Sequence, residues 1–412
     1  MKPTKTICVS LLLLAGTLTG ARGDDYRTDI NPALLYYQAF LFEANGQEHS
    51  QYLITNTWDF GEHLPDQFGS AVSNFNAELE FVREAGQQMA PCDWGTDLSR
   101  HGVETLLPYL GATKQAVIAS QFQIMWDLQN GNEAEARDDL VADLAAGRHA
   151  STTRVLIAAL VEIAIENQVC TMFAQNFNHF SPETLQQIED GFAAAPPRGT
   201  IAECEPTFEV INRWLLSHLA DIQKQYAGDN DGAMDALRHL FYYDASDWER
   251  LTNRSGGTIG GFIQDVRDTE ELYPKLATLM ALPYHEYNEQ LPSYQAEFEQ
   301  SGNAYFLHAW PPWEAARRRE FAVEVRLAMA RAAIEYKLRG DAGLKSVMDP
   351  CGNGPFTMKR FYLNGVDRGF ELQSPLNRGN GPERVIFVEH SGPPFEVMGD
   401  KAGQPFSHKQ GQ

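Results

Sequence analysis

The 412-residue sequence has little of the chemistry that marks the common enzyme classes. It has no Gly-x-Ser-x-Gly motif, which excludes the usual presentation of a hydrolase serine. The glycine-rich run at residues 255–261 lacks the Lys and Ser or Thr of a phosphate-binding loop, so we expect no nucleotide site. In His285-Glu286-Tyr287-Asn288-Glu289 a glutamate stands where a zinc-binding helix needs its second histidine. The sequence therefore predicts no cofactor and no metal.

Basic residues are also scarce. The chain has 33 Lys and Arg against 55 Asp and Glu, a formal net charge of −22. A negative field of this size repels the phosphates of nucleic acids and of anionic lipids, so we expect neither as a partner. The acidic side chains are most simply the solvated faces of helices.

Long apolar runs are missing except at the N-terminus. Lys2 and Lys5 precede an apolar run at residues 7–18, and Ala21-Arg22-Gly23 supplies the small residues that a signal peptidase requires. The run is shorter than the ~20 residues that span a bilayer. We therefore expect residues 1–23 to be a cleaved secretory signal. The product is then exported, periplasmic or secreted, without a stable membrane span, and an uncleaved membrane anchor is the alternative.

Only five cysteines occur, and Cys8 lies within the apolar run. Export permits disulfides, so we expect one bridge among the other four, whose three possible pairings stay open. Cys170 follows an apolar helical run and is equally compatible with a buried thiol. Their spacing matches no zinc pattern. The candidate disulfide residues are Cys92, Cys170, Cys204 and Cys351.

The composition is 43% hydrophobic, which is enough for a large core, and the first half of the chain has helical periodicity. Asn31-Pro32 and Ser181-Pro182 are typical helix starts. The helices joined by short loops predict a helical-hairpin, tetratricopeptide-like bundle or solenoid, although no 34-residue period repeats three times. The expected helices cover residues 33–44, 71–88, 113–130, 133–146, 151–177, 183–194 and 206–226.

The C-terminal part changes character. A long helix is expected at residues 314–339, with an arginine row that we expect to pair with acids of neighbouring hairpins or to hold an anionic partner. That row is Arg317, Arg318, Arg319, Arg326 and Arg331. Short strands at 357–363, 369–373 and 384–389 predict a small antiparallel β element. The expected domains are an α-helical domain at 24–340, a β-rich module at 341–390 and a flexible tail at 391–412.

The segment Pro91-Cys92-Asp93-Trp94-Gly95 is the most reactive-looking loop. In a structural interpretation Asp93 caps a turn, Trp94 fills a groove between helices and Gly95 supplies a positive φ. In a functional one Asp93 and Trp94 contact a ligand or partner. Cys92 as a nucleophile needs a nearby histidine, and a disulfide is its simpler fate after export.

This loop, followed by Leu106-Leu107-Pro108-Tyr109-Leu110 and paired helices, resembles a family of uncharacterised exported or membrane-anchored proteins of planctomycete-like bacteria. The late helix, Asp349-Pro350 and Gly369-Phe370-Glu371-Leu372 are similar to that family's ending. The same C-terminal region also resembles the small sheet that closes major pseudopilins of type II secretion. The resemblance implies export and a helical fold with a closing sheet, and it implies no reaction.

Two functions from different classes are compatible with these patterns. The first is a non-enzymatic helical scaffold or interaction module whose partner is another envelope protein. The second is a hydrolase or lyase that acts on an extracellular polymer through paired carboxylates in an aromatic-lined groove. Opposed carboxylates across an open cleft would favour the second.

Overall fold

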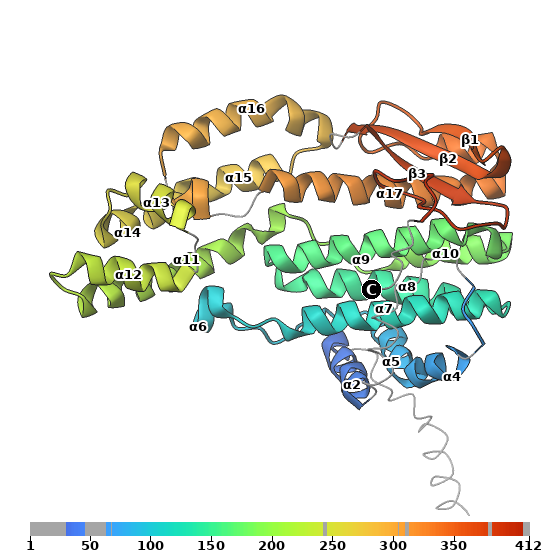
Figure 1. Ribbon diagram of the computed structural model, residues 1–412, viewed down its shortest axis with the longest axis horizontal. Coiled ribbons are helices and arrows are strands. Elements are labelled where there is room, and N and C mark those ends of the chain that lie inside the picture. The colour runs from blue at the N-terminus through green and yellow to red at the C-terminus, as the bar shows by residue number, and fades with distance from the viewer. Residues whose placement is uncertain are drawn as a thin grey trace, which may run out of the picture.

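The structure is a computed structural model that describes residues 30–45, 63–66, 68–241, 245–303, 305–309, 313–377 and 381–406. The expected signal segment at 1–23 lies outside these residues. The described chain is mainly helical, with one three-stranded antiparallel sheet near the C-terminus, as the sequence predicts. Figure 1 shows the central helices, from the second layer onward, running along the length of the molecule and the sheet at one end.

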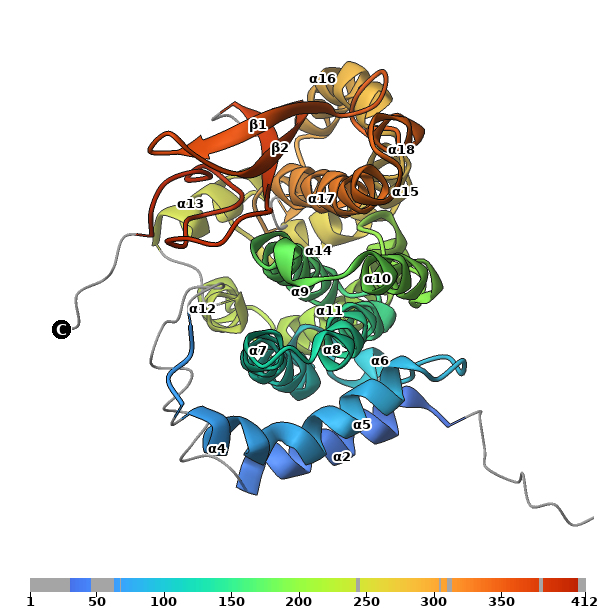
Figure 2. The same ribbon diagram turned by 90° about the vertical axis from the view of Figure 1, so that its right-hand side faces the viewer.

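Helices of the first half of the chain form three stacked layers. Figure 2 looks along the helices of the second and third layers, with those of the first layer running across the bottom of the view. The first layer contains α2 (Pro32–Asn45), α4 (Phe68–Val72) and α5 (Asn76–Gly86), the second α7 (Pro108–Gln129) and α8 (Glu133–Ala150), and the third α9 (Leu156–Gln175) and α10 (Pro182–Ala194). Short segments between them are η1 (Ser73–Phe75), α6 (Leu98–His101), η2 (Gly102–Glu104), η3 (Ser151–Thr153) and η4 (Phe177–His179).

Two of these helices begin where the sequence predicts. The Asn31 side chain accepts a hydrogen bond from the Ala33 amide at the start of α2. Ser181 caps α10 by accepting from the Thr184 amide, with Pro182 at the first helical position. The helix expected at 113–130 begins earlier, at Pro108.

Glycines at the layer contacts allow the helices to approach closely. A Cβ added at Gly86 would lie 3.3 Å from the Ala145 Cβ, which joins the first layer to the second. A Cβ at Gly191 would lie 2.5 Å from the Val141 Cγ2, which joins α10 to α8. The small residues are therefore part of the packing between layers.

The second half of the chain builds the end of the molecule opposite the sheet and then returns along the stack (Figure 1). Helices α11 to α14 form a second hydrophobic core, separate from the main one, and α11 has residues in both. The bounds are η5 (Ala202–Cys204), α11 (Glu205–Gln225), α12 (Asn230–Phe241), α13 (Ala245–Arg254), α14 (Ile259–Asp268), η6 (Thr269–Glu271), α15 (Tyr273–Met280), α16 (Tyr284–Ser301), the π-helical turn η7 (Tyr305–Ala309), α17 (Trp313–Arg339) and α18 (Asp341–Ser346).

The sheet has the order β1-β2-β3, with strands β1 (Thr357–Leu363), β2 (Val366–Asn377) and β3 (Pro382–Val388). Phe370 of β2 pairs with Phe387 of β3, and both rings pack against Phe177 of the third layer. Because the sheet shares its core with the helices, the division expected at residue 340 does not separate two hydrophobic cores.

The expected flexible tail is ordered over its described part. Phe395 is fully buried, and the Ile386 amide of β3 donates to the Val397 carbonyl at 2.8 Å. Residues 391–406 therefore cover the outer edge of β3. The sequence predicts a flexible tail here, whereas apolar side chains among the glycines and prolines pack these residues against the sheet in the structure. Residues 407–412 lie outside the described chain.

One later helix is apolar enough to cross a membrane, contrary to our expectation. Helix α9 meets the length and composition of a membrane span, but 61% of its apolar window is buried inside the molecule. Its neighbours are α8, α17 and β3, so it is the central helix of the stack.

Candidate functional site

The indole of Trp94 is packed inside the helical stack. Its side chain is 5% exposed, and its ring stacks on Tyr109 at 4.2 Å and on Tyr36 at 5.5 Å between centroids. The indole N–H donates to the His149 carbonyl at 2.8 Å. Trp94 therefore joins α2, α7 and α8, in agreement with the structural interpretation of this residue.

Asp93, in contrast, is exposed. Its Oδ1 accepts from the Gly95 amide at 2.9 Å, and Gly95 has a φ of 67°. The Asn31 side chain donates to the Asp93 carbonyl at 2.7 Å and accepts from its amide at 3.0 Å. The loop is thus locked to the start of α2. Contact with a ligand or partner stays a prediction, and Asp93 is the member of the pair that solvent reaches.

The groups around this loop are held in their neutral forms. Burial raises the pKa of the Cys92 thiol to about 12, which removes the thiolate needed for nucleophilic attack. Burial lowers the pKa of His149 to about 4, so its imidazole is neutral at pH 7. The Tyr36 hydroxyl lies 3.0 Å from the His149 Nδ1. This is a packed polar contact, without an activated nucleophile.

The expected disulfide is absent from the described chain. Its four cysteines are free and buried, with Cys170 on α9, Cys204 in η5, and Cys92 and Cys351 in two different loops. Burial raises the pKa of Cys170 and of Cys204 to about 12, and it also raises that of Cys351. The prediction of one bridge is wrong for the described chain. Export would permit a disulfide, but a disulfide also requires two cysteines that the fold brings face to face.

The arginines of the α17 row form ion pairs either with other elements or within their own helix. Arg331 pairs with Glu189 of α10 at 3.0 Å, as expected for contacts with a neighbouring hairpin. Arg326 is buried and pairs with Glu383 of β3 at 2.7 Å. Arg318 instead pairs with Glu314 of its own helix. Arg326 and Arg331 therefore attach α17 to β3 and α10, whereas Arg317 and Arg318 form ion pairs within α17 itself.

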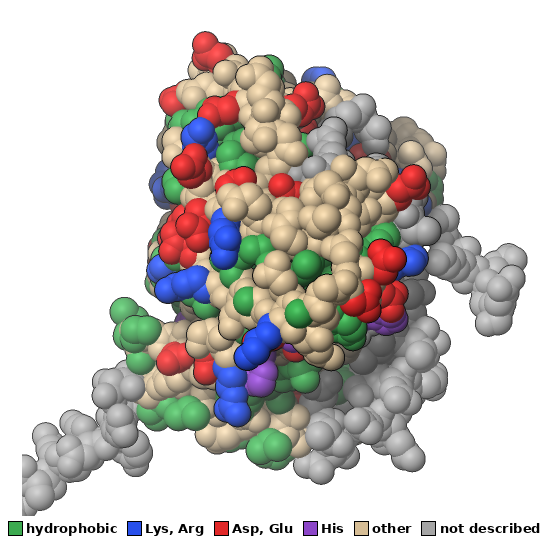
Figure 3. Space-filling view, turned by 90° about the vertical axis from the view of Figure 1, so that its left-hand side faces the viewer, with side chains coloured by type: hydrophobic (Ala, Val, Ile, Leu, Met, Phe, Trp, Pro, Cys, Tyr) green, Lys and Arg blue, Asp and Glu red, His purple; other side chains and the backbone are tan. Residues whose placement is uncertain are grey.

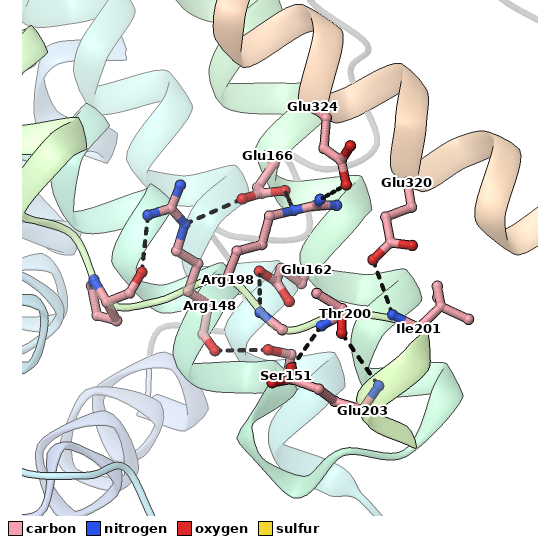
Figure 4. Close-up of polar contacts among 12 residues, drawn as sticks. Arg148, Ser151, Glu162, Glu166, Arg198, Thr200, Ile201, Glu203, Glu320 and Glu324 are labelled. Carbon is pink, nitrogen blue, oxygen red and sulfur yellow. Dashed lines mark hydrogen bonds and ion pairs between the residues drawn. The ribbon is translucent and has the colours of Figure 1, made fainter. Parts of the chain in front are cut away.

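A mostly buried group of charges, which we call the Arg–Glu cluster, lies outside the sites expected from the sequence (Figure 4). Glu166 of α9 accepts from Arg148 at 3.2 Å and from Arg198 at 2.8 Å. Arg198 also binds Glu324 of α17 at 3.0 Å. Glu162 and Glu166 are 0% exposed and Glu320 is 1% exposed. The cluster consists of Arg148, Glu162, Glu166, Arg198, Arg317, Glu320 and Glu324.

Glu162 is the carboxyl of this cluster that has no ion pair among the described contacts. Its Oε1 accepts from the Gly199 amide at 3.2 Å, and its buried Oε2 lies beside the Ser151 hydroxyl. Burial, and next the negative charge of Glu166, raise the pKa of Glu162 to about 9. Glu162 is therefore protonated at pH 7.

The sequence does contain a signal for the two α9 carboxyls of this cluster. Glu162 and Glu166 are four residues apart in a helix that is otherwise almost wholly apolar, so both carboxyls lie on one buried face. The sequence does not reveal the arginine partners of Glu166, since Arg148 lies 18 and Arg198 lies 32 residues away along the chain.

Glu162, Glu166 and Glu320 are closed to solvent, while Glu324 at the edge of the cluster is 31% exposed. This burial limits what the cluster can do chemically. A polymer substrate cannot reach carboxyls that are 0% exposed.

Within the described residues no group of three or more His, Cys, Asp or Glu has the arrangement of a metal site. A small polar pocket of about 140 Å³ lies at the sheet end, between β2, β3 and the following turn, and is lined by Gln373, Gly381, Pro382, Glu383, Arg384, Gly399 and Asp400.

Comparison of the chain with protein-family models, with curated proteins and with solved structures found no match.

Proposed function

We propose that the protein is an exported helical scaffold that acts through contacts with another envelope protein. The observation that carries this proposal is an apolar stripe on the outer side of α2, in the first layer of the stack. Leu34 is 55% exposed, Tyr37 40%, Leu41 67% and Phe42 46%. The spacing of these residues places them on one side of the helix.

The position of the stripe supports an interaction role. The end units of stacked helical proteins usually have polar outer faces, which keep them soluble. Exposed, contiguous apolar residues at such an end are typical of protein–protein contact sites. We further propose that the layers are a short helical-hairpin solenoid of the tetratricopeptide-like kind, an architecture that offers extended binding surfaces.

The loop at residues 91–95 supports the stripe from behind. The Tyr37 hydroxyl donates to the Trp94 carbonyl at 3.1 Å, and the Tyr37 ring lies edge-on to the indole at 5.5 Å. The exposed Asp93 lies beside the start of α2. In this proposal the loop holds α2 in place, and Asp93 forms the rim of the contact surface.

The alternative, a hydrolase or lyase, has less support. Its paired carboxylates would need an open cleft, whereas Glu162 and Glu166 are buried and bound to neighbouring groups. Neither Trp94 nor Tyr109 offers an open stacking surface to a sugar ring, since both are buried.

A cross-linking pull-down from the native envelope tests the proposal. The double variant Leu34→Ser/Leu41→Ser removes the two most exposed side chains of the stripe without touching the core. The matched control is Ile157→Ser on α9, which removes an apolar side chain that is 54% exposed elsewhere. We expect the same partner with wild type and with the control, and its loss with the double variant. Retention of the partner by the double variant would contradict the proposal.

A further inference from the structure

The linker between α10 and α11 joins the two hydrophobic cores of the molecule. It leaves the main stack after Ala194 and leads into α11, whose later residues Leu215 and Leu219 belong to the second core. Residues 195–201 are therefore one of the attachments of α11 to α14 to the main stack, beside Phe208 of α11, which packs in the main core. Figure 3 shows the end of the molecule that these helices form, where acidic and basic side chains are interspersed.

The Arg–Glu cluster holds this linker from three sides, as Figure 4 shows. Helix α8 contributes Arg148, which donates to the Pro196 carbonyl at 2.9 Å. From α9, Glu166 binds Arg198, and Glu162 accepts from the Gly199 amide at 3.2 Å. Helix α17 adds Glu320, which accepts from the Ile201 amide at 3.0 Å. These contacts clamp the linker onto the main stack.

Glu162 lies directly beneath the linker. A Cβ at Gly199 would lie 2.9 Å from the Glu162 Oε2 and 2.5 Å from the Ser151 Oγ, so the backbone there is as close as a side-chain-free residue allows. Ser151 donates its hydroxyl proton to the Arg148 carbonyl, which leaves its lone pairs free to accept from a protonated Glu162.

The charges around Glu162 balance only when this carboxyl is neutral. Three guanidinium groups, from Arg148, Arg198 and Arg317, face Glu166, Glu320 and Glu324 in ion pairs. Glu162 is the fourth acid. The nearby Cys204 thiol adds no charge, because burial raises its pKa to about 12. Ionised Glu162 would thus be a buried negative charge without its own counterion, next to Glu166.

We propose that Glu162 is a protonation-controlled latch on this linker. When neutral it keeps residues 196–201 against α8 and α9. When it ionises, water must reach the new charge, and the linker opens with it, loosening the attachment of α11 to α14. The proposal does not rest on the scaffold function.

The direction of the pH effect follows from linkage. The pKa of Glu162 is raised from 4.5 in the open state to about 9 in the closed state. The closed linker therefore has its full stability below pH 4.5 and loses it progressively as the pH rises towards 9. Opening is greatest above that value.

Trypsin cleavage of the Arg198–Gly199 bond measures this opening, because Arg198 is 14% exposed in the closed form. Initial rates of this one cut are followed by mass spectrometry at pH 7 and pH 9.5, each divided by the rate for a free peptide of residues 196–200. When opening and closing are fast, the ratio follows the open population. For wild type we expect it to rise on the order of tenfold or more.

The variant Glu162→Gln cannot ionise, and we expect its ratio to stay constant between the two pH values. Glu286→Gln, an exposed change on α16, is the matched control and should behave as wild type. Glu162→Met is a second non-ionising variant of similar size, for use if Glu162→Gln does not fold, with circular dichroism as the check. A flat wild-type ratio, or the same rise in a folded non-ionising variant, would overturn the proposal.

Discussion

The indole of Trp94 lies nearly parallel to the ring of Tyr109, with centroids 4.2 Å apart and 12° between the planes. One residue comes from the loop that enters the second layer, and the other from the first turn of α7. This stack, together with the hydrogen bond from the indole to the His149 carbonyl, closes the contact between the first two layers.

Trp94→Ala should therefore be strongly destabilising. Removing a buried aromatic side chain costs about 3–5 kcal/mol, through lost burial and the cavity left behind. Urea unfolding followed by circular dichroism measures the change. The adjacent Asp93→Ala alters an exposed turn and should cost well under that, about 1 kcal/mol or less. Equal effects of the two variants would contradict the assignment of Trp94 as a packing residue.

The buried pair Arg326–Glu383 should matter far more than an exposed pair on the same helix. Glu383→Gln leaves the charge of Arg326 buried without its counterion and should lower the unfolding free energy by about 3–5 kcal/mol. Arg318→Met breaks a pair whose side chains are 39% and 42% exposed, and should cost about 1 kcal/mol or less. Denaturant unfolding of both variants gives the comparison. A smaller loss of unfolding free energy for Glu383→Gln than for Arg318→Met would contradict this prediction.

His149 should make the stability fall in mild acid. Burial lowers its pKa from 6.5 to about 4, so the unfolded chain binds the proton more readily. The associated stability is fully present above pH 6.5 and is lost as the pH falls towards 4, by up to about 3 kcal/mol.

The test compares wild type with His149→Gln in urea from pH 7 to pH 4.5. Other carboxyls titrate in both proteins, so the difference between the two curves isolates His149. This difference should shrink as the pH falls, whereas a constant difference would mean that His149 is not held neutral.

Thiol labelling checks the cysteines. The four described cysteines are buried and free, so the folded protein should react slowly with a thiol reagent, and all four should react in guanidinium without a reductant. A disulfide would leave only two of these four reactive until a reductant is added. Mass spectrometry of the labelled peptides identifies each site.

Local signals in the sequence predicted much of the fold. Asn31-Pro32 and Ser181-Pro182 mark helix starts, because capping and the fixed φ of proline act within a few residues. The strand expected at 357–363 matches β1, since alternating side chains between turns are a local pattern. The packing of residues 391–406 could not be predicted locally, because they bind to the edge of β3, which other residues of the chain form.

The sequence by itself determined the helical periodicity, the caps, the sheet and the strong negative charge, all of which depend on residue type and near neighbours. Tertiary structure alone decided the fate of the reactive-looking groups. It buried Trp94, kept the cysteines apart and gathered the Arg–Glu cluster around residues 196–201. The physical reason is that desolvation and ion pairing depend on which distant segments exclude water from a side chain, and Glu162 and Gly199 become neighbours only when α9 and the linker have packed.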